Sequence, residues 1–335
     1  MPWLRVHMPG LLFALALAAV AYALGTLFPL IGGAVIGILG GIAVGSLVPL
    51  PQRTAPGLAF SAKKILQGAI IVLGSGLALG QVYATGMSSL VIILTTITAA
   101  LCTAAAVGRL LKVRFNLISL IGVGTAICGG SAIAAVAPVI DAEEQEVAYA
   151  ISTVFLFNVV AVLVFPPLGH LLGMTQPGFG MFAGTAINDT SSVVAAAYAY
   201  GNGAGDYATI VKLTRTIMII PIAVAFVPIM MFRTSRTQSG GSAGGFNFVK
   251  VFPWFIVGFV AASALNTSGV LSANTVHVLR ETGKFMIIMA LTAIGLRTDL
   301  KKMLHTGFAP AFLGLAVWIV VSATSVIVQK LLGQW

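Results

Sequence analysis

Four long stretches without any charged residue constrain the fold of this chain most strongly. They cover residues 6–52, 65–108, 115–140 and 147–188, which are 47, 44, 26 and 42 residues long. A helix needs roughly 20 apolar residues to cross a bilayer. The two longest stretches therefore each have room for two crossings and a turn, and the shortest has room for one. The sequence predicts an all-α polytopic membrane protein, with a single transmembrane domain over residues 1–335.

The composition excludes other classes of protein. Only 8% of the 335 residues are charged and 59% are hydrophobic, whereas soluble domains typically contain about 25% charged residues. The formal net charge of +10 does not indicate a nucleic-acid partner. Nucleic-acid binders concentrate basic residues on one face, but here they form small groups between apolar runs, as membrane topology requires.

Hydropathy predicts eleven spans, with ends uncertain by a few residues. If the N-terminus is cytoplasmic, 13 of the 18 Lys and Arg residues fall in inner loops, and cytoplasmic loops are expected to hold this excess. The arrangement predicts a cytoplasmic N-terminus, a periplasmic C-terminus, a cytoplasmic linker at about 233–250, and an acidic segment at 141–146 outside, read as a solvated linker or a cation vestibule. The spans are 11–28, 30–48, 65–83, 88–107, 117–140, 147–169, 180–200, 208–232, 251–268, 282–297 and 307–330.

A near-repeat inside two predicted spans is the most informative motif. Residues 124–137 read GTAICGGSAIAAVA and residues 184–197 read GTAINDTSSVVAAA, so 7 of 14 positions are identical at a spacing of 60. The Gly-rich and Asn-Asp-Ser-rich patches are poor helix interiors. Irregular backbone at membrane depth is tolerated where it lines a cavity or is buried in protein. The two patches predict two broken helices that share an internal site, although small residues that only let helices pack closely are the alternative.

Such a site favours an anion. A half-helix that begins in either patch presents free backbone N–H groups and the positive end of its dipole, and nearby hydroxyls add donors. Transporters with discontinuous helices hold substrates in this way near the bilayer midplane. The predicted substrate-binding residues are Cys128, Gly129, Gly130, Ser131, Asn188, Thr190, Ser191, Ser192 and Arg215.

Asp189 is the only carboxyl group well inside the predicted spans. An intramembrane acid costs several kcal/mol unless it is paired or protonated, and it is a functional candidate by default. We predict that Asp189 carries a coupling proton or cation, with Asn158 of the preceding span as a second group facing the site. Arg215 either pairs with Asp189 or holds the anion, whereas Lys212, near the outer end of its span, is expected to snorkel.

Two further sequence patterns concern the packing of helices, and a third observation concerns catalytic and nucleotide-binding motifs. Residues 292–295 read TAIG and echo residues 125–127, in the antiparallel sense expected of inverted repeats. The run GGAVIGILGGIAVG at 32–45 permits close helix contacts or a homodimer. The sequence contains no HExxH or Walker pattern, and its GxSxG match at residues 240–244 lies in the Ser/Gly-rich linker, so it predicts neither an enzyme, nor a cofactor, nor a metal site.

Three runs together resemble a known family: GTAICGGSAIAAVAPVI, AGTAINDTSSVVAAAYAYG and MALTAIGLRTDLKK. The chain resembles the bacterial YeiH family (UPF0324), which carries the label of sulfate exporters, over nearly its whole length. The resemblance implies a secondary transporter of the bacterial inner membrane, similar to bile-acid symporters and sodium/proton antiporters. It also implies inverted repeats, here at about 30–170 and 180–330, and an elevator movement of a core against a scaffold.

Together, residues and resemblance predict a secondary transporter that exports a small anion, such as sulfate or sulfite. Coupling to H⁺ or Na⁺ is open, because the membrane potential alone drives a dianion out of the cell by about 2.3 kcal/mol per charge per 100 mV. Two alternatives remain: an anion channel, and a transporter of an organic acid or sulfonate. An enzyme that acts on membrane lipid would need clustered acids, bases or metal ligands near an interface, which the sequence does not contain.

Overall fold

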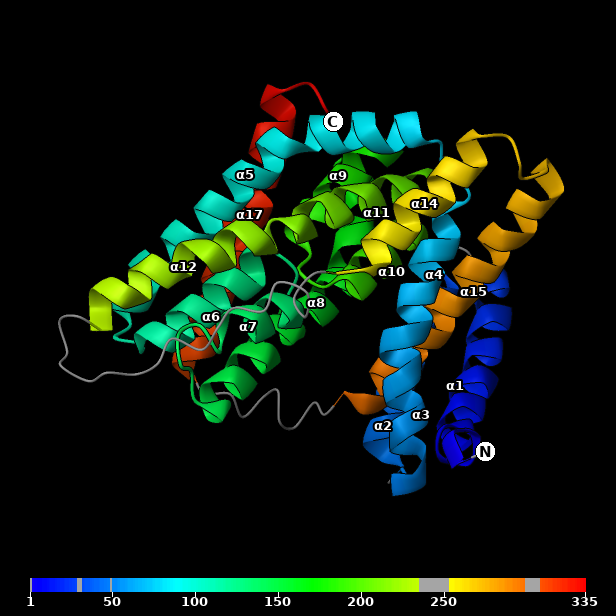
Figure 1. Ribbon diagram of the computed structural model, residues 1–335, viewed down its shortest axis with the longest axis horizontal. Coiled ribbons are helices and arrows are strands. Elements are labelled where there is room, and N and C mark those ends of the chain that lie inside the picture. Colours follow the sequence, from blue (N-terminus) through cyan, green and yellow to red (C-terminus); the bar gives the residue numbers. More distant parts are fainter. Residues whose placement is uncertain (1, 29–31, 49, 235–252, 299–307) are drawn as a thin grey trace.

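All described elements of the chain are helical. The computed structural model describes residues 2–28, 32–48, 50–234, 253–298 and 308–335, and within these ranges it contains helices and no strand (Figure 1). The predicted all-α polytopic class is confirmed, because six helical runs among these residues are each long and apolar enough to cross a membrane. They are Trp3–Leu27, Gln52–Gly74, Leu79–Leu110, Glu144–Leu171, Asn202–Phe226 and Phe308–Leu331.

The first of two bundles is built around the pair α2 and α15. These helices pack along each other, α1 lies against α2, and α4 packs between α15 and α14. In Figure 1 this bundle occupies the right side, with the N-terminus at its lower end. Its elements are α1 (Pro2–Leu27), α2 (Gly33–Leu47), η1 (Gln52–Thr54), α3 (Ala55–Phe60), η2 (Ser61–Ile65), α4 (Leu66–Gly74), α14 (Phe255–Thr267) and α15 (Ala273–Arg297).

The second bundle surrounds the two sequence repeats. The long helices α5 and α17 pack against each other and cover α6, while α11 lies against both α9 and α10 (Figure 1). Its elements are α5 (Leu79–Leu110), α6 (Phe115–Ala126), α7 (Gly130–Val136), α8 (Glu144–Leu171), α9 (Gln176–Ala186), α10 (Thr190–Tyr200), α11 (Asn202–Ile217), α12 (Ile219–Thr234) and α17 (Phe308–Leu331). The two bundles meet where α10 contacts α2 and α15, and where α14 contacts α5.

Glycines bring α2 and α15 into close contact. A Cβ on Gly41 would lie 2.5 Å from the carbonyl oxygen of Thr292, and one on Gly295 would lie 2.3 Å from that of Ile38. The glycine pattern of residues 32–45 and the TAIG echo of residues 292–295 therefore act together in packing within the chain, and the echo lies in an unbroken helix. The homodimer stays a prediction, and it would need a surface other than this one.

The third predicted span is displaced toward the N-terminus. We expected it at 65–83, but the helical run covers Gln52–Gly74 and the chain turns before α5 begins at Leu79. Lys63 and Lys64 lie inside this run, in the π-helical turn η2, and both are exposed. Long lysine side chains reach water from within a membrane helix, so charge alone did not mark the helix boundary here.

Helices α9 and α10 form a hairpin, which corrects the prediction that 180–200 crosses the membrane. The Tyr200 hydroxyl at the end of α10 donates to the carbonyl of Met174, just before α9 begins. Gly203 N donates to Gln176 Oε1 at 2.7 Å. Each helix has 11 residues, or about 16 Å, so a continuous span would hold these ends more than 30 Å apart. The chain therefore enters and leaves at the same end of the bundle.

Helices α6 and α7 form a second hairpin, so the predicted span 117–140 is also wrong. Ile133 of α7 packs against Gly124 of α6, where an added Cβ would lie 2.8 Å from the Ile133 Cδ1 atom. At the open end of this hairpin, Asn116 donates to Glu146 at 3.1 Å and Arg114 lies 3.6 Å from Glu143. Both acids belong to the start of α8, so the chain has returned to the end from which α6 departed.

The two hairpins enter the bundle from opposite ends. Helix α17 begins near the open end of the α6–α7 hairpin, where Ala309 and Pro310 share a cavity with Arg114 and Glu143. The chain ends near the other hairpin, because Thr175 Oγ1 donates to the carbonyl of Trp335 at 2.8 Å. The two similar segments, which are separated by helix α8, therefore enter the bundle in opposite directions.

This topology leaves nine of the eleven predicted spans as candidates for crossing. Removing two spans preserves the predicted placement of the termini at opposite ends, as Figure 1 shows.

The acidic segment 141–146 lies at a different end from the predicted one, because Glu143 lies beside Arg114. It therefore belongs to the same end as the basic residues before α6, and the predicted outer position is wrong. The linker at 233–250 lies almost entirely outside the described residues, and the larger repeat halves stay a prediction.

Labelling of single cysteines will test the hairpins. In a background with Cys102→Ala and Cys128→Ala, Lys112→Cys and Glu144→Cys should both react with a membrane-impermeant maleimide from one side of the membrane. Leu172→Cys and Asn202→Cys should both react from the opposite side. If either pair reacts from two different sides, the corresponding segment crosses the membrane and the hairpin is wrong.

Candidate functional site

The tip of the α9–α10 hairpin is closed by Asp189. The break covers residues 187–189, and Asp189 is the N-cap of α10. Its Oδ2 accepts hydrogen bonds from the backbone N–H groups of Ser191 at 3.0 Å and Ser192 at 3.2 Å, and from the Ser191 hydroxyl. The carboxylate thus occupies the place at the helix N-terminus where an anion is expected to bind. Thr190, the first residue of α10, is half-buried beside it.

Asn158 holds the same break from the side of α8. Its Oδ1 accepts from the backbone N–H groups of Asn188 at 3.0 Å and Asp189 at 3.4 Å. Asn158 is 1% exposed, and these bonds satisfy two donors that the break would otherwise leave unpaired. The structure therefore gives Asn158 a backbone-holding position, while the predicted role in ion coupling stays a prediction.

Two buried cations donate hydrogen bonds to the carbonyl groups at the C-terminal ends of α6 and α9, the half-helices that lead to the breaks. Arg215 donates through Nη2 to the Thr125 carbonyl at 2.7 Å, through Nε to Ala126 at 2.7 Å, and through Nη1 to Ile187 at 3.3 Å. Lys212 Nζ donates to the carbonyls of Ile127 at 2.7 Å and Ile187 at 3.0 Å. The last carbonyls of α6 and α9 carry the negative ends of the helix dipoles, so both cations satisfy charge and hydrogen bonding together.

These contacts correct the expectations for both cations. Arg215 bonds to carbonyls, with no hydrogen bond to Asp189 among the described residues, so the predicted Arg215–Asp189 pair is wrong. Lys212 does not snorkel, because its side chain is 0% exposed. Helix α11 begins at Asn202, earlier than the predicted 208, and Lys212 therefore lies about 15 Å below its start. That depth is about half of a 30 Å hydrocarbon core. The three-residue spacing between Lys212 and Arg215 places both side chains on one face of the helix, and this was the sequence signal that Lys212 is buried together with Arg215.

The tip of the α6–α7 hairpin lies against the first tip. Gly129 has φ 66° and ψ −126°, a conformation that side chains with Cβ rarely adopt. An added Cβ at Gly129 would lie 3.8 Å from Cβ and 3.9 Å from Cα of Asp189. The buried thiol of Cys128 precedes it in the same break. The two sequence repeats therefore meet tip to tip, joined on one side by Lys212 and Arg215.

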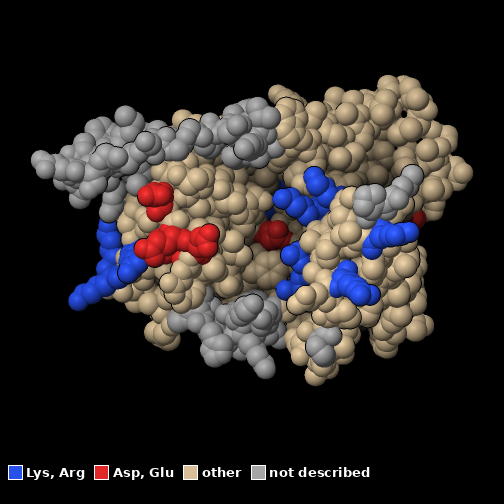
Figure 2. Space-filling model, turned by 60° about the horizontal axis from the view of Figure 1, so that its bottom comes forward, with Lys and Arg blue, Asp and Glu red and all other residues tan. Residues whose placement is uncertain are grey.

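The tips are partly open and contain an unsatisfied amide. Gly130 and Ser131 at the start of α7 are exposed, and Asp189 is half-buried. Asn188 is 1% exposed, yet neither its Oδ1 nor its Nδ2 has a hydrogen-bond partner among the described residues. Figure 2 brings the N-terminal end forward and shows a hollow between two lobes, with an acidic side chain deep inside it. Buried polar groups are normally satisfied, so Asn188 indicates a polar ligand or water.

The structure thus places the predicted site residues in one region, where some hold the backbone in place and others are free to contact a ligand. Ser191, Ser192, Asn158, Lys212 and Arg215 hold the irregular backbone through the bonds described above. The groups left to meet a ligand are the Asn188 amide, the Asp189 carboxylate and the exposed start of α7. The hydroxyl groups of Ser131 and Thr190 make no hydrogen bond to the described part of the protein, and they are exposed and half-buried, respectively.

Comparisons with known proteins agree on one family. The profile of the family described as Conserved hypothetical protein 698 matches residues 9–314. A UPF0324 membrane protein of Streptococcus pyogenes serotype M6 is 45% identical over 98% of both chains. UPF0324 membrane proteins of Fusobacterium nucleatum, 43% identical over 97% of this chain and 98% of the relative, and of Clostridium tetani, 40% identical over the whole of both, are also similar. Because these matches cover nearly the whole chain at high identity, the chain belongs to the UPF0324 family of membrane proteins.

Proposed function

We propose that this protein is a secondary transporter that exports a small anion, such as sulfate or sulfite, across the bacterial inner membrane. The observation that carries the proposal is the meeting of two opposed hairpin tips around a buried, unsatisfied Asn188 amide and the Asp189 carboxylate. Discontinuous helices that meet in this way form the substrate sites of many secondary transporters.

The charge of the tips supports an anionic substrate. Two cations, Lys212 and Arg215, and one carboxylate, Asp189, leave a formal charge of +1. The helix dipoles cancel to a first approximation, because two C-terminal and two N-terminal half-helix ends meet there. A single extra positive charge in a low-dielectric site favours an anion over a neutral solute or a cation.

Competition for the N-terminus of α10 provides a way to couple the anion to a proton. While Asp189 is ionised, it occupies the N–H groups of Ser191 and Ser192. A protonated Asp189 binds these donors more weakly and changes the charge of the tips from +1 to +2, which suits a dianion. One proton would then bind with each sulfate, and the net charge moved would be −1, which the potential still drives outward.

The two-bundle architecture supports alternating access by an elevator movement. The second bundle holds both hairpins, whereas the first contributes α2, α14 and α15 to the boundary between the bundles. The hollow in Figure 2 opens between the two lobes toward the N-terminal end. Sliding of the second bundle along this boundary would carry the tips from one side of the membrane to the other, with the packing inside each bundle retained.

Thermal stabilisation of the purified protein tests the substrate. A ligand that binds the native state raises its stability by about 2.7 kcal/mol at one hundred times its Kd, so sulfate, sulfite or thiosulfate should raise the unfolding temperature. Asn188→Ala should raise the Kd of the anion at least tenfold, which roughly halves the stabilisation at the same ligand concentration. The variant should still fold, because the Asn188 side chain bonds to no described part of the protein.

Asn266→Ala provides the matched control, since Asn266 lies in the last turn of α14, and it should retain the full response. A full response in Asn188→Ala would place the anion elsewhere. Stabilisation by organic acids or sulfonates alone would replace sulfate as the substrate class, and stabilisation by Na⁺ alone would contradict an anion site.

A further inference from the structure

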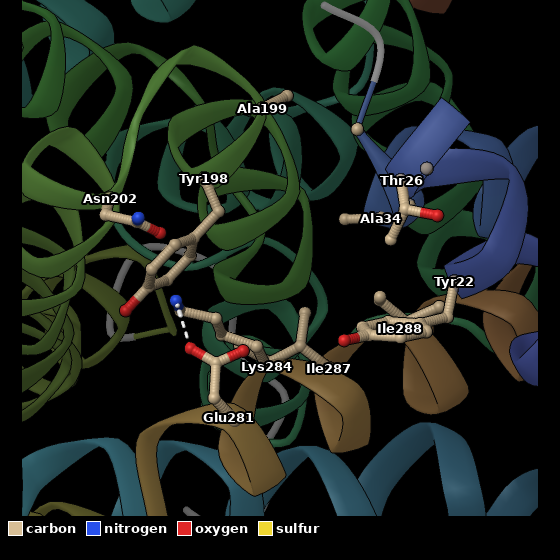
Figure 3. A pocket seen from close by; sticks show the side chains of 13 residues that line it. Tyr22, Thr26, Ala34, Tyr198, Ala199, Asn202, Glu281, Lys284, Ile287 and Ile288 are labelled. Atoms are coloured by element: carbon tan, nitrogen blue, oxygen red, sulfur yellow. Dashed lines mark hydrogen bonds and ion pairs between the residues drawn. The ribbon is translucent and has the colours of Figure 1, made fainter. Parts of the chain in front are cut away.

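A cavity lies between the two bundles, apart from the hairpin tips. It has a volume of about 410 Å³ and is lined by α1 and α2, by the end of α10 and the start of α11, and by α15. Figure 3 shows Tyr22, Thr26 and Ala34 on one side, Tyr198 and Asn202 on the other, and Glu281 and Lys284 on α15 between them. The cavity therefore touches both bundles at once.

The cavity carries one charge of each sign. Lys284 Nζ lies 2.7 Å from Glu281 Oε1, and the side chains are 23% and 43% exposed. Each retains unused hydrogen-bonding capacity, because an ammonium group has three donors and a carboxylate accepts through two oxygens. The Tyr22 hydroxyl and the Asn202 amide also line the space, and neither bonds to the described part of the protein.

A polar bridge next to the cavity joins the bundles. Tyr198, whose ring forms one wall, donates through its hydroxyl to Asp206 Oδ1 at 2.7 Å. The other oxygen of Asp206 pairs with Arg280 Nη2 at 2.5 Å, and Arg280 Nη1 donates to the Gly76 carbonyl at 3.4 Å. The wall formed by Tyr198 is thus fixed to α15 at Arg280, which directly precedes Glu281 and lies one turn before Lys284.

We propose that this inter-bundle cavity binds a zwitterionic 2-aminoethyl phosphodiester or sulfonate group, in which one ammonium and one acidic group give zero net charge. Its ammonium would pair with Glu281, and its acidic oxygens would accept from Lys284, Tyr22 and Asn202. A ligand of net charge would leave one member of the Glu281–Lys284 pair without its counterion in a partly buried site, which is costly. A zwitterionic ligand gives each member of the pair a new counterion, because its ammonium pairs with Glu281 and its acidic oxygens pair with Lys284. The group is available as a free metabolite or as the headgroup of phosphatidylethanolamine.

Such a ligand would also oppose movement between the bundles. It would contact α1 and α15 of the first bundle and α10 and α11 of the second, and it would reinforce the bridge through Asp206. This consequence rests on the proposed function, whereas the binding itself does not. Binding is therefore measured directly, without a transport assay.

Titration of the detergent-purified full chain with glycerophosphoethanolamine and taurine tests the proposal. Both should bind, whereas ethanesulfonate and ethanolamine, which each lack one of the two charges, should bind at least tenfold more weakly. Glu281→Gln and Lys284→Gln should each reduce affinity at least tenfold, and Asn202→Ala, which loses no protein hydrogen bond, about threefold or more. Arg114→Gln removes a different ion pair and should change nothing.

Native mass spectrometry of protein from nanodiscs distinguishes the two sources. Retention of phosphatidylethanolamine over phosphatidylglycerol and phosphatidylcholine, lost in Lys284→Gln, would assign the lipid headgroup. Binding of the free compounds without lipid retention would assign a soluble ligand. Equal binding of ethanesulfonate, or unchanged affinity in Glu281→Gln, Lys284→Gln and Asn202→Ala, would overturn the proposal.

Discussion

Replacing Arg215 with methionine is expected to lower the stability of the protein more than any other single change described above. The guanidinium donates to three backbone carbonyls, of Thr125, Ala126 and Ile187, and it is 0% exposed. Hydrogen bonds from a charged donor contribute roughly 1.5–3 kcal/mol each. Methionine fills much of the volume and donates nothing, so the Thr125 and Ala126 carbonyls at the end of α6 lose the guanidinium as their partner. The Ile187 carbonyl at the end of α9 keeps only Lys212.

We expect a loss of about 4 kcal/mol or more in the free energy of unfolding. At roughly 2–4 °C per kcal/mol, the unfolding temperature should fall by at least about 8 °C. Arg109→Met is the matched control, because Arg109 is an exposed cation in the last turn of α5, and surface changes usually stay within about 0.5 kcal/mol. Arg215→Lys should fall between them, since it keeps the charge but loses the planar fork of donors. Equal stability of Arg215→Met and Arg109→Met would show that the hairpin ends do not depend on this cation.

The helical class and the two irregular patches were predictable from the sequence because both follow from local composition. Charge-free runs mark helices in a membrane, and the patches beginning at Gly129 and Asn188 contain residues that interrupt helices. The position of Asp189 before Thr190 and two serines is also a local signal for an N-cap. These predictions depend on nearest neighbours along the chain, so no tertiary structure was needed to make them.

The hairpin topology was not predictable in the same way. A run of 24 apolar residues with a break fits one interrupted crossing or one re-entrant hairpin equally well, because length and hydropathy are the same in both. The difference depends on long-range contacts, such as the bond of Tyr200 to Met174 and that of Asn116 to Glu146. The depth of Lys212 in the membrane could not be predicted for the same reason, because it depends on where α11 begins after the α9–α10 hairpin. Its hydrogen bonds to the carbonyls of Ile127 and Ile187 were therefore not predictable either.

Replacing Asp189 with asparagine should abolish the proton uptake that accompanies anion binding, while the anion still binds. Asparagine is about as good an N-cap as aspartate, so without ligand the variant should keep the bonds from Ser191 and Ser192 and unfold within about 1 kcal/mol of the wild type. The asparagine amide is neutral, so an anion can displace it from these N–H groups without the charge repulsion that the Asp189 carboxylate would exert. The charge of the tips would rise from +1 to +2 without a proton. Sulfate should therefore bind at least tenfold more tightly near pH 7, and its affinity should no longer depend on proton uptake.

Isothermal titration in buffers of different ionisation enthalpy measures that uptake. The wild type should take up about one proton for each sulfate bound, so that its affinity rises as the pH falls, whereas Asp189→Asn should take up none. Glu146→Gln is the matched control, because Glu146 is also a buried acid at a helix N-terminus, bonded to Asn116 at the open end of the other hairpin. It should take up one proton like the wild type. Proton uptake that persists in Asp189→Asn would move the coupling group elsewhere, and an uptake of zero in the wild type would mean that the carboxylate and the anion do not compete for the N-terminus of α10.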